Sequence, residues 1–242
     1  GTHVLALRTP KWSGVRATLK SDLPLTADGT PTAAAASHPT PTLRLAFTAT
    51  AGESFGIGFD AMTTNVSSKR ISFALHRPNG TVWKTARCED SGVAGECGIV
   101  ARNAPADGIY TVVVKPVNVA ATQFPARVWL SREIEHELAF DTPMQLAMPR
   151  RGQIAKLYFD AVAGQRLQFS QKDATASPNR MSFEYVPAAP SGACLIQSGC
   201  QPWRQSGNAY VAFPVLTESG RYFIPITMSN DGARSSTGSA TV

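Results

Sequence analysis

The sequence predicts an all-β protein built from two tandem antiparallel β-sandwich domains. Three observations predict this class. Apolar residues alternate with period two over short runs, turn residues separate these runs, and much of the chain repeats after 112 positions. Short half-buried strands between Gly, Pro and Asn turns are typical of sandwiches. No stretch keeps a capped helical period over the roughly 10–12 residues that a helix needs.

The repeat is clearest in residues 45–59 and 157–171. Each copy is predicted to form a strand, an Ala-Gly turn and a second strand. The pairs at an offset of 112 include Leu45/Leu157, Phe47/Phe159, Gly52/Gly164, Gly108/Gly220 and Tyr110/Tyr222. So many matches in one register indicate a tandem duplication. We therefore expect one sandwich over residues 16–127 and the other over residues 128–242.

The segments outside this pattern are assigned from composition. Residues 1–15 resemble the last strands of a unit and are expected to be terminal strands of a preceding repeat or extra strands of domain one. The chain is then a fragment of a longer array, and the rest of that parent chain is an expected partner. Residues 30–42 are rich in Pro, Ala and Thr and are predicted to form a surface loop. Residues 131–138, SREIEHEL, are predicted to form a short helix or a linker with a solvated acidic face.

Composition excludes several classes of protein. With 43% hydrophobic and 17% charged residues, the chain is neither disordered nor a coiled coil. No apolar run approaches the roughly 20 residues of a membrane span. The net charge of +6 comes with paired basic residues and no basic block, which favours a solvated surface over a binding site for acidic polymers. No nucleic-acid-binding signature is present, and no nucleic acid partner is expected.

Four cysteines form two close pairs with the spacings C-x8-C and C-x5-C. No His lies near either pair, so two local disulfides, Cys88–Cys97 and Cys194–Cys200, are favoured over a metal site. Disulfides indicate an oxidising compartment, which predicts a secreted or cell-surface protein, extracellular or periplasmic. We predict no metal and no cofactor.

The string GESFG, residues 52–56, matches the GxSxG pattern of hydrolases. A nucleophile elbow needs a helix directly after its serine, and Ser54 is followed by the strand pattern FGIGFD. The second copy carries Arg166 at this position. The turn interpretation is therefore favoured, an esterase using Ser54 stays as a minor hypothesis, and no catalytic residue is predicted.

Aromatic residues give the remaining indication of a ligand. Trp12, Trp83 and Trp203 lie near turns, and Arg204 follows Trp203. Exposed Trp beside Arg can stack on sugars, so these four residues are the candidate ligand-binding residues. The alternative, which we favour, is that each indole covers the open end of a sandwich.

Several marks of the two units resemble the bacterial pre-peptidase C-terminal (PPC-like) domain. They are AGES and AGQR after the first strand, RPNG and APSG at a hairpin, and DGIYTVVV and SGRYFIPI near the end. Similar tandem units occur in large secreted or surface bacterial proteins. The resemblance implies a jelly-roll-like sandwich that accompanies a catalytic or structural region elsewhere in the parent protein. Some relatives bind calcium or matrix polymers, but their Asp-rich ligands are not evident here, so no binding residue is carried over.

These observations predict a non-catalytic tandem module of a secreted or cell-surface bacterial protein, serving as a stalk, spacer or adhesive unit. The alternative is a carbohydrate- or matrix-binding accessory module of a secreted hydrolase. Its partner would be a cell-wall or extracellular polysaccharide.

Overall fold

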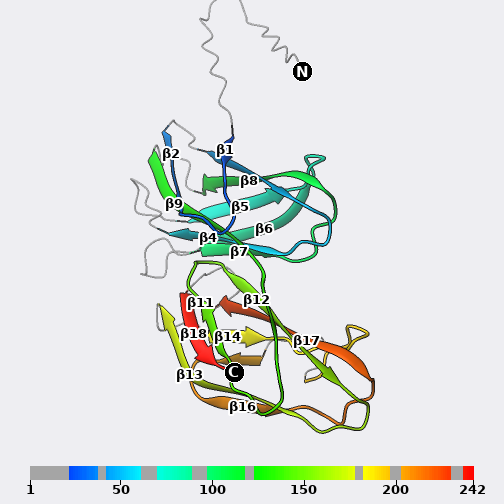
Figure 1. Ribbon diagram of the computed structural model, residues 1–242. Coiled ribbons are helices and arrows are strands. Elements are labelled where there is room, and N and C mark those ends of the chain that lie inside the picture. The colour runs from blue at the N-terminus through cyan, green and yellow to red at the C-terminus, as the bar shows by residue number, and fades with distance from the viewer. Residues whose placement is uncertain are drawn as a thin grey trace, which may run out of the picture.

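A computed structural model shows two β-sandwiches in series, which confirms the predicted fold class (Figure 1). The structure describes residues 22–37, 42–60, 70–88, 97–117, 123–177, 182–196, 203–229 and 237–242. The predicted terminal strands in residues 1–15 and the candidate Trp12 lie outside these ranges. No helix occurs in the part of the chain that the structure describes.

The first sandwich packs a five-stranded sheet against a four-stranded sheet. The five-stranded sheet has the order β1 (Leu23–Pro24), β3 (Leu43–Ala49), β8 (Gly108–Pro116), β5 (Ile71–His76) and β6 (Val82–Cys88). The four-stranded sheet has the order β2 (Thr32–Ser37), β9 (Gln123–Arg132), β4 (Phe55–Asp60) and β7 (Cys97–Ala101). Every pair of neighbours is antiparallel except β1 and β3, which run parallel.

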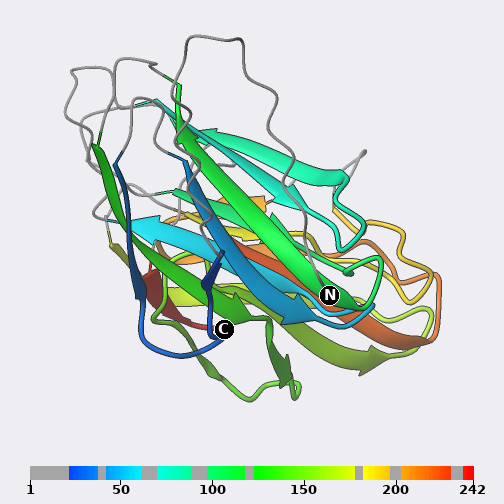
Figure 2. The ribbon, with the colours of Figure 1, turned by 90° about the horizontal axis from the view of Figure 1, so that it is seen from above.

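The second sandwich has the same strand order. Its five-stranded sheet runs β10 (Ile134–Glu137), β12 (Ile154–Ala161), β17 (Gly220–Ser229), β14 (Ser182–Tyr185) and β15 (Trp203–Gln205). Its four-stranded sheet runs β11 (Gln145–Met148), β18 (Thr237–Thr241), β13 (Gln168–Ser177) and β16 (Ala209–Ala212). Here the parallel edge pair is β10 and β12. Figure 2 looks down onto the first sandwich, with the second behind it.

The period-two pattern places one face of each strand in a core. In β3, Leu45 and Phe47 are buried while Arg44 between the inward positions is exposed. Their counterparts in β12, Leu157 and Phe159, are buried in the second core. Alternate side chains of a strand point to opposite faces, so the alternation in sequence becomes an inner and an outer surface.

The Ala-Gly turns are held in the same way in both sandwiches. The Gly52 N–H donates to Ala104 O at 2.8 Å, and the Gly164 N–H donates to Leu216 O at 2.8 Å. Both glycines have left-handed backbone, with φ of 83° and 91°. A side chain disfavours this conformation, which explains why glycine occupies the turn in each copy.

A buried tyrosine closes the matching corner in each sandwich. Tyr110 donates its hydroxyl proton to Ala106 O at 2.7 Å, and Tyr222 donates to Glu218 O at 2.7 Å. Both rings are fully buried, so each hydroxyl needs an acceptor within the protein. The two corners therefore fix the loops before β8 and β17 in the same geometry.

Two segments predicted to be irregular are strands, and those predictions are wrong. Residues 32–37 of the predicted loop form β2, because Ala34 and Ala36 are small enough to be buried where β2 pairs with β9. The predicted helix or linker at 131–138 contains the end of β9 and all of β10. Ile134 packs against the second core on one face of β10, whereas Glu135 and Glu137 alternate on the other. A period of two in the side-chain contacts favours a strand.

β9 links the two sandwiches. The expected domain limit between residues 127 and 128 falls inside this strand, and its last residue, Arg132, still pairs with Phe55 of β4. The chain enters the second sandwich at Ile134, where β10 pairs with β12. Only Glu133 separates the two strands.

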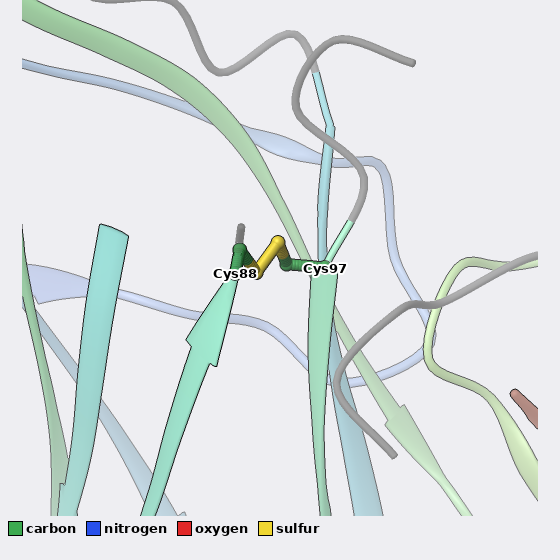
Figure 3. The surroundings of a disulfide bond; sticks show 2 residues. All are labelled: Cys88 and Cys97. Atoms are coloured by element: carbon green, nitrogen blue, oxygen red, sulfur yellow. A yellow bond between two sulfur atoms is a disulfide. The ribbon is translucent and has the colours of Figure 1, made fainter. Parts of the chain in front are cut away.

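A disulfide joins Cys88 and Cys97, as the spacing predicted, with 6.0 Å between the two Cα atoms (Figure 3). Cys88 ends β6 and Cys97 begins β7, so the bond connects edge strands of the two opposed sheets. Cys194 is also disulfide-bonded, and its predicted partner Cys200 lies outside the described residues. The Cys88–Cys97 bond limits the separation of the sheets at this edge.

The second core contains a polar pair that the first core lacks. Tyr185 donates its hydroxyl proton to Gln171, whose amide donates to Gly207 O, and both side chains are fully buried. The aligned residues of the first sandwich are the apolar Leu75 and Phe59. Burial raises the pKa of the Tyr185 hydroxyl, so it stays a neutral donor. The pair satisfies the polar groups that the second unit places in its core.

We predict that Gln171→Leu lowers the free energy of unfolding by about 1–3 kcal/mol, because it leaves the buried Tyr185 hydroxyl without its acceptor. Adding Tyr185→Phe should recover most of that loss, because the site then matches the apolar arrangement of the first sandwich. Urea unfolding of the two single variants and the double variant measures the coupling. Additive losses would contradict a paired role.

Candidate functional site

The two sandwiches meet on β4, where the Arg151–Gly152 turn contacts Gly56 and Gly58. We call this contact the joint and treat it as the candidate site. All six residues of β4 are buried, although only alternate residues face the first core. On the outer face, the backbone of Arg151 and Gly152 from the second sandwich lies directly against Gly56 and Gly58. A Cβ atom at Gly56 would overlap Gly152 O, and one at Gly58 would overlap Arg151 O. The two sandwiches can approach this closely only because both β4 residues lack side chains.

Ion pairs surround this backbone contact. Asp60 at the end of β4 accepts from Arg127 at 2.7 Å and from Arg151 of the second sandwich at 3.3 Å. Asp28 of the first sandwich pairs with Arg150 at 3.3 Å. The Arg150 guanidinium also donates to the backbone O of Asp28 at 2.7 Å. Charges of opposite sign on the two sandwiches therefore fix the orientation of the Arg151–Gly152 turn.

A third ionic contact lies at Glu133, the single residue between β9 and β10. Arg102 follows β7 in the first sandwich, forms an ion pair with Glu133, and donates to Ile226 O of β17 at 3.1 Å. Lys156 of β12 lies 3.7 Å from the Glu133 carboxylate, whose side chain is only 6% exposed. Burial lowers the pKa of Arg102 to about 10, which still leaves the guanidinium charged at neutral pH. The buried carboxylate thus bridges cations from both sandwiches.

We predict that Arg102→Met destabilises the protein by on the order of 3 kcal/mol, because the buried Glu133 loses one of its cationic partners. Arg102→Met combined with Glu133→Gln should be much less destabilised, because no buried charge then lacks its counter-charge. Thermal unfolding of both variants tests this. Equal stability of the single and double variants would rule out the bridge.

The outer face of β10 carries contacts that hold it to the second sandwich. Tyr158 donates to Glu135 at 3.1 Å, and Arg221 pairs with Glu137 at 2.6 Å. The Arg221 guanidinium also lies 4.4 Å from the centre of the Tyr158 ring. Burial and then the hydrogen bond to Glu135 raise the pKa of Tyr158. The acidic row predicted as a solvated face is therefore paired across β12 and β17.

The structure places Trp83 and Trp203 against the two cores. Trp83 in β6 lies 5.7 Å from Tyr110 and 6.1 Å from Phe55, measured between ring centres. Trp203 in β15 lies 5.3 Å from Tyr185, measured the same way. Both indoles are half-buried on edge strands. Each covers the edge of its own sandwich.

The predicted ligand-binding residues do not form one cluster. Trp83 and Trp203 belong to different sandwiches, and Trp12 lies outside the described residues. Arg204 is exposed and pairs with Glu184 at 2.7 Å. Consecutive strand residues point to opposite faces, so Arg204 and Trp203 do not present one surface.

We predict that Trp203→Ala destabilises the second sandwich by on the order of 2 kcal/mol, because it removes a half-buried ring that packs against Tyr185. Arg204→Lys should change stability by less than about 1 kcal/mol, because it keeps a positive charge beside the buried Glu184. Chemical unfolding measures both. A stable Trp203→Ala variant would instead favour a ligand-stacking role for the indole.

Ser54 closes a turn. Its hydroxyl oxygen accepts from the Asn103 N–H at 3.1 Å, and its backbone O accepts from the Glu133 N–H at 3.0 Å. Ser54 is buried, and strand β4 follows it directly, so the helix of a nucleophile elbow is absent at this position. The turn interpretation accounts for its contacts.

A cavity of about 660 Å³ opens in the second sandwich. Its inner wall is aromatic and includes Phe159, Phe169 and Phe213. Its other walls are residues 138–143, the start of β13 and the end of β18.

No cluster of three or more metal-ligating side chains occurs within the described ranges. Among the same residues there is also no helix long and apolar enough to span a membrane.

Sequence reasoning missed the joint, although a signal was present. Gly56 and Gly58 alternate along a strand, and glycine in a strand marks close approach of another backbone. The large residues between the two glycines predict the strand but not this contact. The partners Arg102 and Glu133 are 31 positions apart and carry no local pattern that pairs them.

No protein-family model matches the sequence, so the resemblance to PPC-like domains stays a prediction. No curated protein matches it either.

Three solved structures show a distant likeness. One is a provisionally assigned secreted protein from Parabacteroides distasonis, with 9% identity over 89% of this chain and 90% of that chain and a TM-score of 0.25. Another is dimeric latent PorU from Porphyromonas gingivalis, with 10% identity over 85% of this chain and 21% of that chain and a TM-score of 0.23. The third is PNGF-II, with 6% identity over 94% of this chain and 64% of that chain and a TM-score of 0.23. Likenesses with such low TM-scores carry no argument about function.

Proposed function

We propose that this chain is a non-catalytic, rigid two-sandwich module of a secreted or cell-surface bacterial protein, acting as a stalk or spacer. The observation that carries the proposal is the joint on β4, where Gly56 and Gly58 receive the Arg151–Gly152 turn of the second sandwich. Flexibly linked domains do not need backbone contact of this kind. A spacer of fixed geometry does.

The ion pairs support the same function. Asp60, Asp28 and Glu133 each bind a cation across or beside the joint. Pairs at several separate points resist rotation of one sandwich against the other. The side chains of Asp60 and Glu133 are 10% and 6% exposed, and buried ion pairs are screened by salt less than exposed ones.

The disulfides support the proposed compartment. The Cys88–Cys97 bond and the oxidised Cys194 are features of proteins that fold in an oxidising environment. A disulfide that closes a loop of this length stabilises a domain by roughly 2–3 kcal/mol on the chain-entropy model. This supports a location outside the cytoplasm.

Gly58→Val tests the rigid module. Valine favours strands, so it should leave the first sandwich folded while its side chain prevents docking of the Arg151–Gly152 turn. We expect a single unfolding transition in the parent protein and two transitions in the variant. Small-angle scattering should also show a broader distribution of interatomic distances.

The matched control is Ser170→Val, at the equivalent position of β13 in the second sandwich. It adds a similar side chain away from the joint and should leave the scattering profile unchanged. A Gly58→Val profile identical to that of the parent protein would overturn the rigid-joint proposal.

Adhesion and glycan binding are separable from rigidity. Glycan binding is the alternative function, but Trp83 and Trp203 are half-buried, so only part of each indole is open to a sugar. A pull-down with purified cell-wall polysaccharide at low and physiological salt distinguishes the two. Retention that Trp203→Ala abolishes would favour the accessory-module alternative over a simple spacer.

A further inference from the structure

One row of side chains on the outer face of the first five-stranded sheet contains two cations and no carboxylate. In β5, Ile71 and Phe73 face the core, so Ser72 between them faces outward. Ser72 lies between Arg87 of β6 and Lys115 of β8, its partners in the two neighbouring strands (Figure 1). Opposed residues of neighbouring strands have Cβ atoms about 5 Å apart, so both cations can reach a group that lies above Ser72.

The same row of the second sandwich contains its own carboxylate. There Glu184 of β14 lies between Arg204 of β15 and Thr227 of β17. The Glu184 carboxylate pairs with Arg204 at 2.7 Å and accepts from the Thr227 hydroxyl at 3.3 Å. By their places in the sheet, Glu184 and Thr227 correspond to Ser72 and Lys115, 112 positions earlier. A carboxylate thus fits in this row, and the second unit supplies it from its own chain.

A groove of about 510 Å³ opens over this row in the first sandwich. Its lining includes Ser72, Arg87 and Lys115, and it continues along β5 to Ala74, which is paired with Thr85 of β6. The small side chains of Ser72 and Ala74 form the floor between longer side chains on both neighbouring strands. A water molecule takes about 30 Å³ in the liquid, so the groove holds a ligand much larger than a single ion.

The charges around the groove favour an anionic ligand. Arg87 and Lys115 are exposed, and neither forms an ion pair with a carboxylate within the described ranges. None of the described residues that line the groove is Asp or Glu. The carboxylate of Asp22, near β3, is paired with Arg44 at 2.7 Å. The potential over the groove is therefore positive.

The place of the groove in the sheet favours a sugar over a peptide strand. β5 is hydrogen-bonded to β8 on one side and to β6 on the other, so it has no free backbone edge on which a strand could be added. Hydroxyl groups stand beside the cations instead. The Ser72 hydroxyl donates to Lys115 O at 3.3 Å, and the Thr85 side chain is exposed. Hydroxyls both donate and accept hydrogen bonds, which matches the hydroxyl groups of a sugar.

We propose that this groove binds an acidic sugar unit of an extracellular polysaccharide, with the sugar carboxylate between Arg87 and Lys115. The carboxylate takes the place that the Glu184 carboxylate has in the second sandwich. The sugar ring lies along β5, over Ala74 and against Thr85. This site is independent of the joint on β4, so the rigid module stands if the sugar site fails.

Trigalacturonate, titrated into the full isotopically labelled chain, is the probe. We expect chemical-shift changes at the amides of Ser72, Ala74 and Thr85, and weaker binding as salt is added, because both cations are exposed. Arg87→Gln and Lys115→Gln should each weaken binding by roughly fivefold. No binding of trigalacturonate at low salt would overturn the proposal.

Three controls separate this site from general attraction of charge. The neutral trisaccharide galactotriose should not bind. Arg166→Gln, which removes one positive charge from an exposed position of the second sandwich, should leave binding of trigalacturonate unchanged. An equal effect of Arg166→Gln and Lys115→Gln, or equal binding of the two trisaccharides, contradicts the site. If triglutamate binds as tightly as trigalacturonate, the groove recognises acidic peptides and the sugar proposal is wrong.

Ser72→Glu tests the arrangement of the two cations without any ligand. We expect this variant to melt at a higher temperature than Ser72→Gln, which has a side chain of the same size without the charge. The introduced carboxylate would pair with Arg87 and Lys115 as Glu184 pairs with Arg204. Ser72→Glu should also lose binding of trigalacturonate. A melting temperature no higher than that of Ser72→Gln would show that the two cations do not converge on this row, and the proposal would fail.

Discussion

Burial of β4 on both faces is the constraint on which the rest of the structure depends. Its large residues, Phe55, Ile57 and Phe59, fill the first core, and its glycines receive the second sandwich. Most strands of a sandwich have one face exposed to solvent, and that face tolerates many different residues. β4 cannot, because a side chain on either face meets protein. Core packing and domain orientation are consequently encoded in six consecutive residues.

Local patterns predicted much of the fold because they report local physics. Alternation of apolar residues predicted strands, and Ala-Gly turns recurred where left-handed backbone is required. The turn before each tyrosine corner was also visible from its glycine and tyrosine. The prediction of a loop at residues 30–42 was wrong for residues 32–37. The Ala, Pro and Thr composition is typical of loops, but pairing with β9 makes residues 32–37 a strand. Tertiary contacts overrode local propensity there.

The candidate site was harder to predict because its partners are distant in sequence. Ion pairing of Arg102 with Glu133, or of Asp60 with Arg151, depends on how two folded bodies meet. The tryptophans were visible as unusual residues near turns, but their sequence positions do not reveal that Tyr110 and Tyr185 lie under them. Only the spacing of Gly56 and Gly58 in β4 is a local sequence pattern that indicates the joint.

The two units share a strand order and differ in the chemistry placed on it. In the second core, Gln171 and Tyr185 form a hydrogen bond, whereas the aligned residues of the first core, Phe59 and Leu75, are apolar. Phe213 of the second sandwich also stands in place of Ala101 of the first. The two sandwiches therefore have the same strand order but different core and edge residues.

The glycine pair of β4 has a consequence for symmetry. A head-to-tail contact that each unit could repeat would build an open helical filament. The positions equivalent to Gly56 and Gly58 in the second sandwich hold Gln168 and Ser170, whose side chains occupy the space that the turn would need. The joint therefore has a polarity. A turn like Arg151–Gly152 could not dock on β13 in the way that it docks on β4.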